Sequence, residues 1–205
     1  MPSRLNELPD HALLDAFERG EAPAFAVLVE RHQRPLYNFI LRSVSARDAA
    51  EDLLQETWVR VIQRAADFKR DSKFTTWLYT IARNLCIDHA RKMKHRRHAS
   101  LDATPPDGGA ALVDRIGDGA PDPERASEGG HMQERVARAV AALPDDQREV
   151  FLLRQVQGMA FADIALVVGV PENTAKSRMR YALERLQLEL GDYREYAEAS
   201  AQGAR

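Results

Sequence analysis

The sequence predicts an all-α protein made of two small helical domains joined by a flexible linker. Apolar residues recur at helical spacing in both halves of the chain, and no alternating apolar pattern indicates strands. Between the halves, residues 99–130 hold 6 of the 11 glycines and 4 of the 10 prolines. A segment of that composition cannot bury enough surface to offset the entropy of ordering it. We therefore expect domains at 1–98 and 131–190, tethered flexibly, and a frayed tail at 191–205.

Composition places the chain among ordinary soluble proteins. It has 205 residues, of which 44% are hydrophobic and 29% charged. No apolar run approaches the ~20 residues that cross a bilayer, and the first ten residues do not resemble a signal peptide. The single cysteine, Cys86, excludes an intramolecular disulfide and suits a reducing compartment. These features predict a cytoplasmic protein without membrane insertion.

The net charge of −2 conceals two blocks of opposite sign. Residues 24–98 carry 15 basic and 8 acidic side chains, whereas residues 99–130 carry 7 acidic and 2 basic ones. Basic blocks of this kind bind polyanions more often than other surfaces do, although many are only solvated faces. The first domain is therefore a candidate for nucleic-acid binding.

Three long helices are expected in the first domain. Apolar spacing predicts a helix over 24–43 that Pro35 can kink. Ser45 and Asp48 resemble a capping box that starts a second helix reaching about Asp67. The third helix is expected over 75–94. The expected buried stripe of the second helix consists of Leu53, Leu54, Trp58, Val61 and Ile62.

The second domain contains the pattern of a helix-turn-helix. A short helix over 161–168 is followed by Gly169, which can take the positive φ of a turn, and by Val170, which can plug the helix junction. Pro171 and Glu172 suit the start of a helix expected over 173–190. In DNA-binding proteins this geometry inserts the second helix into the major groove.

The polar face of that second helix carries side chains that hydrogen-bond base edges and phosphates. A plain helical hairpin would also show a polar outer face. The face therefore indicates DNA binding only in combination with the turn beside it. Arg178 lies where many repressors of this class bury an apolar residue, with Met179 one step later. The candidate DNA contacts are Asn173, Thr174, Lys176, Ser177, Arg178, Arg180 and Tyr181.

Two separate motif sets resemble the sigma factors of bacterial RNA polymerase. Residues 164–183, with Gly169 and Lys176-Ser177-Arg178, resemble the last helix-turn-helix of that family. Residues 50–58 and 74–84, which include Gln55-Glu56-Thr57-Trp58 and Phe74-Thr75-Thr76-Trp77, resemble its second conserved region. The length and two-domain order are similar to those of the extracytoplasmic-function class. The resemblance implies a promoter-specificity subunit, with core RNA polymerase (its β′ coiled coil and β flap), promoter DNA and an anti-sigma factor as partners.

The resemblance also assigns surfaces in the first domain. An acidic stripe would dock on the β′ coiled coil, and it consists of Asp48, Glu51, Asp52, Gln55 and Glu56. A loop and the helix after it would bind −10 DNA and capture an extruded base, through Lys69, Arg70, Asp71, Ser72, Lys73, Arg83, Asn84, Asp88, Arg91 and Lys92. Asn173 and Ala175 depart from the family pattern, which affects the promoter sequence. The acidic linker suits either a nucleic-acid mimic or a plain tether.

Two other classes of protein remain as alternatives. A free-standing dimeric helix-turn-helix regulator would need a dimer interface, and no amphipathic helix is reserved for one. A zinc site at Cys86, His89, His95 and His98 matches no tetrahedral template. No nucleophile–base set stands out, so we expect no enzyme activity, no metal and no cofactor.

Overall fold

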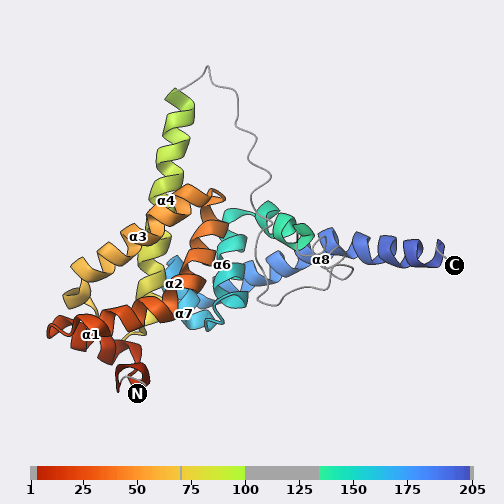
Figure 1. Cartoon of the computed structure of the whole chain (residues 1–205). Coiled ribbons are helices and arrows are strands. Elements are labelled where there is room, and N and C mark those ends of the chain that lie inside the picture. The colour runs from red at the N-terminus through yellow and green to blue at the C-terminus, as the bar shows by residue number, and fades with distance from the viewer. Residues whose placement is uncertain (1–3, 70, 100–133, 204–205) are drawn as a thin grey trace.

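The structure, a computed structural model, describes residues 4–69, 71–99 and 134–203. All regular elements in these ranges are helices, and no strand occurs among them, so the predicted all-α fold is confirmed (Figure 1). The expected linker lies outside the described residues from position 100 onward, and so does Arg70.

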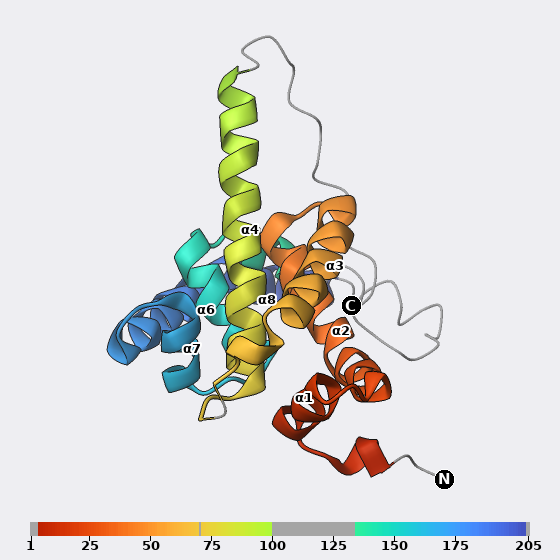
Figure 2. The ribbon, with the colours of Figure 1, turned by 90° about the vertical axis from the view of Figure 1, so that its left-hand side faces the viewer.

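The first domain is built from four α-helices. α1 (Asp10–Glu18) follows a short 3-10 helix, η1 (Arg4–Glu7), and packs on α2 (Ala22–Val44). α3 (Arg47–Gln63) leads through a second 3-10 turn, η2 (Ala65–Asp67), to α4 (Phe74–Ala99). α4 packs on both α2 and α3, and its C-terminal half stands clear of the rest of the molecule (Figures 1 and 2).

The start of α3 corrects a prediction. Ser45 does not open a capping box: its φ of 57° places it in the left-handed region as the C-cap of α2, and its N–H donates to the Leu41 carbonyl at 2.8 Å. The N-cap of α3 is Ala46, without a side-chain cap. Within α3, Leu53, Trp58 and Val61 are buried as expected, whereas Ile62 is 46% exposed.

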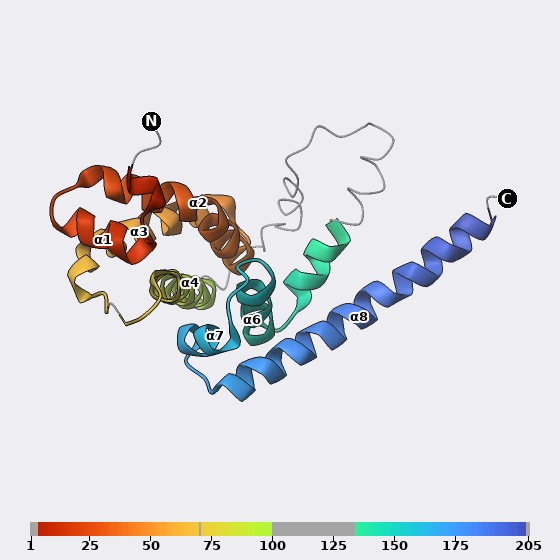
Figure 3. The same ribbon diagram turned by 90° about the horizontal axis from the view of Figure 1, so that it is seen from below.

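The second domain begins with helical residues 134–142, followed by α6 (Asp145–Gln155) and α7 (Phe161–Val168). α8 (Glu172–Gly203) packs on α6 and α7 near its start and then extends away from the body (Figure 3). The helix therefore continues through the segment expected to fray. Alanine, glutamate and arginine after Gly191 have high helix propensity, and one internal glycine costs only about 1 kcal/mol. Leu183, expected to be buried, is 45% exposed.

The described parts of the two domains pack directly against each other, a contact that the sequence did not predict. α7 lies along α4, and α6 contacts α2, so α4 is held between α2 and α3 on one side and α7 on the other (Figures 2 and 3). Buried side chains from both domains form one continuous apolar cluster. The apolar side chains that meet there include Phe39 of α2 and Cys86 of α4, with Leu152 of α6 and Val168 of α7. Helical periodicity within one domain does not show that these residues lie together.

Candidate nucleic-acid and polymerase interfaces

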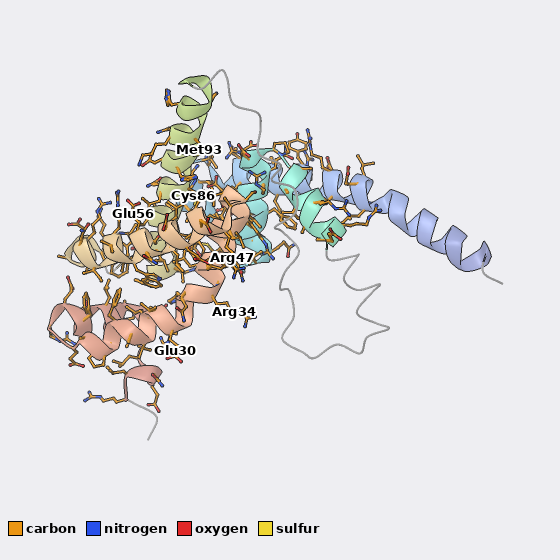
Figure 4. All side chains as sticks on the ribbon, turned by 45° about the horizontal axis from the view of Figure 1, so that its top comes forward. Glu30, Arg34, Arg47, Glu56, Cys86 and Met93 are labelled. Carbon is orange, nitrogen blue, oxygen red and sulfur yellow. The ribbon has the colours of Figure 1, made fainter. Side chains whose placement is uncertain are left out.

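The predicted acidic stripe lies on the outer side of α3. Its five members are all exposed: Asp48, Glu51, Asp52, Gln55 and Glu56. Glu56, labelled in Figure 4, accepts a hydrogen bond from Arg60 at 2.9 Å, one helical turn away. Glu51 pairs more loosely with Arg47 at 3.4 Å. Exposed pairs of this kind contribute little to stability, so the stripe is available to a basic partner.

A hollow of about 340 Å³ adjoins this stripe. Its floor is apolar, formed by Leu53 of α3 and Leu85 of α4, and its rim is charged. Asp52, Glu56 and Arg60 line one side, and Asp88, His89 and Lys92 line the other. An apolar floor with a charged rim is a common anatomy of protein–protein interfaces.

The loop before α4 is anchored by buried aromatic rings. Phe68 and Phe74 are 8% and 3% exposed, and their ring centroids lie 6.2 Å apart. Trp77 packs on Phe68 at 5.3 Å. The rings therefore fix the two ends of the loop, and they do not present a free face for a base in this conformation.

Between those anchors the loop is polar and exposed. Ser72 donates its hydroxyl hydrogen to the Lys69 carbonyl at 2.7 Å, which closes a tight turn. Lys69 and Asp71 are exposed. Lys73 is exposed as well, yet its Nζ lies 2.6 Å from Asp163 Oδ2 in α7 of the other domain. One predicted DNA contact is thus already occupied by a carboxylate.

The predicted contacts on α4 fall into two groups. Asn84, Asp88, Arg91 and Lys92 are exposed, and Arg91 lies 3.8 Å from Asp88. Arg83 is different: its side chain is only 21% exposed, and its guanidinium forms an ion pair with Glu149 of α6. Burial raises the pKa of Glu149, against the opposing effect of Arg83.

The helix-turn-helix has the predicted geometry. Gly169 adopts a φ of 71° at the end of α7, and its N–H and that of Val170 donate to the Ala165 carbonyl at 2.9 and 3.1 Å. These two hydrogen bonds at a left-handed glycine satisfy the Ala165 carbonyl at the end of the helix, and the chain turns sharply there. α8 then starts at Glu172, after Pro171. The predicted turn residues are confirmed at these positions.

The outer face of α8 presents most of the predicted −35 contacts to solvent. Asn173, Lys176, Ser177, Arg180 and Tyr181 are exposed, and Thr174 and Arg178 are half-buried. The Arg180 guanidinium lies 4.9 Å from the centre of the Tyr181 ring. Arg178 Nε lies 3.2 Å from Asp146 Oδ2 at the start of α6, which explains how an arginine occupies this position.

Sequence reasoning missed the acids that engage these cations. Glu149, Asp163 and Asp146 had no assigned role, because their partners lie far away in the chain and no local motif marks them. The only available signal was an acidic side chain on an otherwise apolar helix, Asp163 in α7.

The former zinc candidates do not form a common site in the described part of the chain. Cys86 is buried, and burial raises the pKa of its thiol to about 12. His89 is half-buried, His95 is exposed, and the side chain of His98 lies outside the described residues. Within the described ranges no group of three or more His, Cys, Asp or Glu is placed to hold a metal ion. None of the described helices is both long and apolar enough to span a bilayer.

Family models match both domains. The model described as sigma-70 region 2 matches residues 28–97, and that described as sigma-70, region 4 matches residues 133–186. Among curated relatives, the RNA polymerase sigma-H factor of Pseudomonas aeruginosa is 32% identical over 180 residues, covering 88% of this chain and 93% of the relative. The ECF RNA polymerase sigma factor SigW of Bacillus subtilis is 29% identical over 175 residues, covering 85% and 93%.

Solved structures give the same result. The sigma factor RpoE from Bartonella quintana, in complex with the anti-sigma factor NepR, aligns with a TM-score of 0.68 and 26% identity over 82% of this chain and 96% of that one. CnrH, in complex with the cytosolic domain of CnrY, has the same fold, with a TM-score of 0.64 and 22% identity over 89% and 97%.

These matches favour the sigma factor over the dimeric regulator. Both motif sets fall in their family models, in the family order, and the curated relatives match over nearly their whole length. Sigma factors of this family direct RNA polymerase to promoters in transcription initiation. The chain belongs to the extracytoplasmic-function class of the sigma-70 family of RNA polymerase sigma factors.

Proposed function

We propose that this sigma factor docks on core RNA polymerase through the acidic stripe of α3 and reads two promoter elements with its two domains. The proposed domains are residues 1–98, with the docking and −10 surfaces, and 131–190, with the −35 surface. Residues 99–130 would link them. The observation that carries the proposal is the separation of charge: carboxylates gather on the outer face of α3, while cations gather on α4 and its preceding loop.

The physical argument rests on sign and exposure. A stripe with four carboxylates repels the phosphate backbone, so on a DNA-binding domain it suits a basic protein partner. The exposed Arg91 lies on the C-terminal half of α4, which stands clear of the rest of the molecule, so a duplex can approach it there (Figure 1). The exposed Lys92 lines the hollow between α3 and α4. Lysine and arginine there would neutralise phosphates and release counterions.

In the second domain, the exposed side chains of α8 would enter the major groove at the −35 element. Lys176 and Arg180 suit phosphates or guanine, and Asn173 suits adenine. Their neighbours on the same helix, Glu172 and Glu184, form exposed ion pairs at 2.6 and 3.7 Å that water and salt weaken. DNA phosphates can therefore replace these acids.

Control by an anti-sigma factor and a cytoplasmic location complete the proposal. The support is the similar sigma factor RpoE of Bartonella quintana, whose structure is a complex with the anti-sigma factor NepR. RNA polymerase is the proposed site of action, and the chain would act as a specificity subunit without catalysing a reaction itself.

The test is reconstitution. The purified chain is mixed with bacterial core RNA polymerase, isolated as a complex, and used to transcribe a library of promoters. We expect a stoichiometric complex that initiates at a discrete set of promoters sharing two elements. Failure to bind core polymerase, together with tight binding of the free chain to duplex DNA, would overturn the proposal.

A further inference from the structure

A small apolar pocket lies where the end of α2 meets the second domain. Its volume is about 180 Å³, and its walls come from helical residues 134–142, from α6 and from the last turn of α2. Most of the lining side chains are aliphatic or aromatic, among them Val136, Val140, Phe151 and Val156. The end of α2 lies beside α6, as Figure 3 shows. None of these residues belongs to the surfaces proposed for DNA or polymerase.

The chain's own side chains do not fill this pocket. Val140 is 8% exposed, whereas Val136, Phe151 and Val156 are half-buried and pack only partly on the core. Well-packed protein interiors leave few voids larger than a water molecule. An engineered cavity of about 150 Å³ with a similar apolar lining stays dry and binds benzene. The pocket therefore has the size and the lining to take one aromatic ring.

Arg42 adds a positive charge to this apolar pocket. It is the only charged residue among the described lining residues, and it lies half-buried in the last turn of α2. Burial lowers the pKa of its guanidinium, and no acidic side chain in the described part of the chain offsets that effect. The carbonyl end of a helix favours a cation, which compensates only in part. A desolvated guanidinium without a counter-ion is suited to bind a carboxylate through two parallel N–H···O hydrogen bonds.

Other partly buried arginines of the chain have an acid beside them. Arg31 pairs with Asp10 at 2.9 Å, and Arg83 forms an ion pair with Glu149. Burying a charge costs free energy unless a partner of opposite charge is present. The chain supplies that partner at Arg31 and Arg83, whereas at Arg42 an anion from outside can supply it.

We propose that this pocket binds a small aromatic carboxylate, with its ring between Val140, Phe151 and Val156 and its carboxylate on the Arg42 guanidinium. The two halves of the ligand come from separate observations. The volume and lining of the pocket set the size and apolar character of the ring, and the unpaired guanidinium sets the charge of the head group. A neutral ring would leave Arg42 without a counter-ion, and a small inorganic anion would leave the pocket empty. The site needs neither polymerase nor DNA.

Benzoate is the probe for this site, and benzamide is its neutral match in size. Isothermal titration calorimetry with the full chain should give one benzoate site per chain, with a Kd of about 1 mM or lower, as suits a ligand of about nine non-hydrogen atoms. Benzamide, and acetate, which keeps the charge and lacks the ring, should bind at least about tenfold more weakly. The absence of benzoate binding would overturn the site. Tighter binding of hexanoate than of benzoate would overturn the assignment of an aromatic ligand.

Two variants separate the charge from the space. Arg42→Gln should weaken benzoate binding at least about tenfold and make benzoate and benzamide bind alike. Ala137→Leu fills the pocket from its wall and should weaken benzoate binding at least about tenfold with Arg42 in place. Arg47→Gln is the matched control, since it removes the same charge at an exposed position of α3, labelled in Figure 4, and should bind benzoate as the wild type does. Circular dichroism checks that each variant is folded.

The position of the ligand is read from methyl NMR spectra of the wild-type chain. Benzoate should shift the methyl resonances of Val136, Val140 and Val156, which line the pocket, and leave those of Val59 unchanged, because Val59 is 49% exposed on α3. Benzoate should also raise the thermal unfolding midpoint of the wild type and not that of Arg42→Gln, since a ligand that binds only the folded state stabilises it. Wild-type benzoate affinity in both Arg42→Gln and Ala137→Leu, or shifts confined to residues outside the pocket, would overturn the proposal.

Discussion

The outer face of α3 and the side of α4 that faces the second domain belong to the same domain, yet their charged side chains have different kinds of partner. On α3 the charged side chains meet mainly their own helical neighbours, such as Glu56 with Arg60. On α4 the charged side chains meet another domain, as Arg83 does with Glu149. Charge alone therefore does not show whether a surface is free to bind a partner. What matters is whether the partner that neutralises the charge is a weak local one or a distant one that must be displaced.

Reversing charge on the open surface should have the largest effect. Asp52→Lys combined with Glu56→Lys is expected to weaken binding to core polymerase by at least about a hundredfold, since like charges would meet at a basic partner. Both side chains are exposed, so the thermal unfolding midpoint should stay within a few degrees. Affinity is measured by fluorescence anisotropy with labelled core.

Glu21→Lys with Asp67→Lys is the matched control for that pair, because it reverses two exposed charges elsewhere in the first domain. The control should bind core polymerase as the wild type does. If the stripe variant also bound normally, the α3 face would be only a solvated surface.

The contrast between local and distant partners also explains what the sequence could predict. α7 spans the predicted residues 161–168, and the turn glycine, Gly169, takes the predicted φ, because these depend on local periodicity and local backbone preference. Ser45 was assigned to the wrong helix end, since a serine near a helix boundary serves as N-cap far more often than as a left-handed C-cap. The exposure of Ile62 and Leu183 depends on which neighbours cover them, and periodicity does not contain that information.

For the candidate surfaces, too, the sequence predicted the local features and not the contacts between distant segments. The stripe on α3 and the face of α8 are set by one helix each, so the sequence located their residues on exposed faces. The pairing of Lys73 with Asp163 joins positions 90 residues apart, and nothing local to either residue indicates it. Reasoning from one segment at a time recovers surfaces and misses what covers them.

A second prediction concerns a charge engaged within one domain. Arg178 is held by Asp146 at 3.2 Å and is 25% exposed. Arg178→Ala should lower transcription that depends on the −35 element about tenfold, because it removes one contact to a base or phosphate and the ion pair with Asp146. Asp146→Asn should weaken it only about two- to fivefold, because it removes the orienting partner and keeps the guanidinium.

Transcription from library-selected promoters with intact and scrambled −35 elements measures both variants. Arg185→Ala, at an exposed position further along α8, is the control and should show wild-type promoter use. If Arg178→Ala reduced transcription equally from both promoter forms, Arg178 would have a structural role and no part in reading the element.

A third prediction concerns an ionic cluster between α1 and α2. Asp10 accepts hydrogen bonds from Arg31 at 2.9 Å and from His32 at 2.8 Å, tying α1 to α2. Burial alone would raise the pKa of Asp10, but the hydrogen bonds and charges of His32 and Arg31 outweigh it, so the pKa lies below 3.8. A lowered native pKa stabilises the fold above the unfolded-state pKa, and this contribution is lost as the pH falls through the native value.

Asp10→Asn should therefore lower the free energy of unfolding by about 1 kcal/mol at pH 7. The difference from wild type should shrink as the pH falls below the ordinary value of 3.8. Urea unfolding across that range measures it, with the exposed Asp67→Asn as control. A difference that stayed constant with pH would mean that the loss comes from the changed hydrogen-bonding groups and that the carboxylate charge contributes nothing.

The smallest effect is expected on the apolar side of α4. Tyr79 is 2% exposed and packs edge-on against Phe39 of α2, with ring centroids 5.2 Å apart. Its hydroxyl is buried without a hydrogen-bond partner among the described residues, and burial raises its pKa. Tyr79→Phe keeps the ring and removes the unsatisfied group, so the free energy of unfolding should rise by up to about 1 kcal/mol. Tyr37→Phe, at a half-buried position of α2, should change it less. A loss of stability in Tyr79→Phe would show that the hydroxyl has a partner in solution, and α4 would then be held by polar contacts on this side as well as on the side facing the second domain.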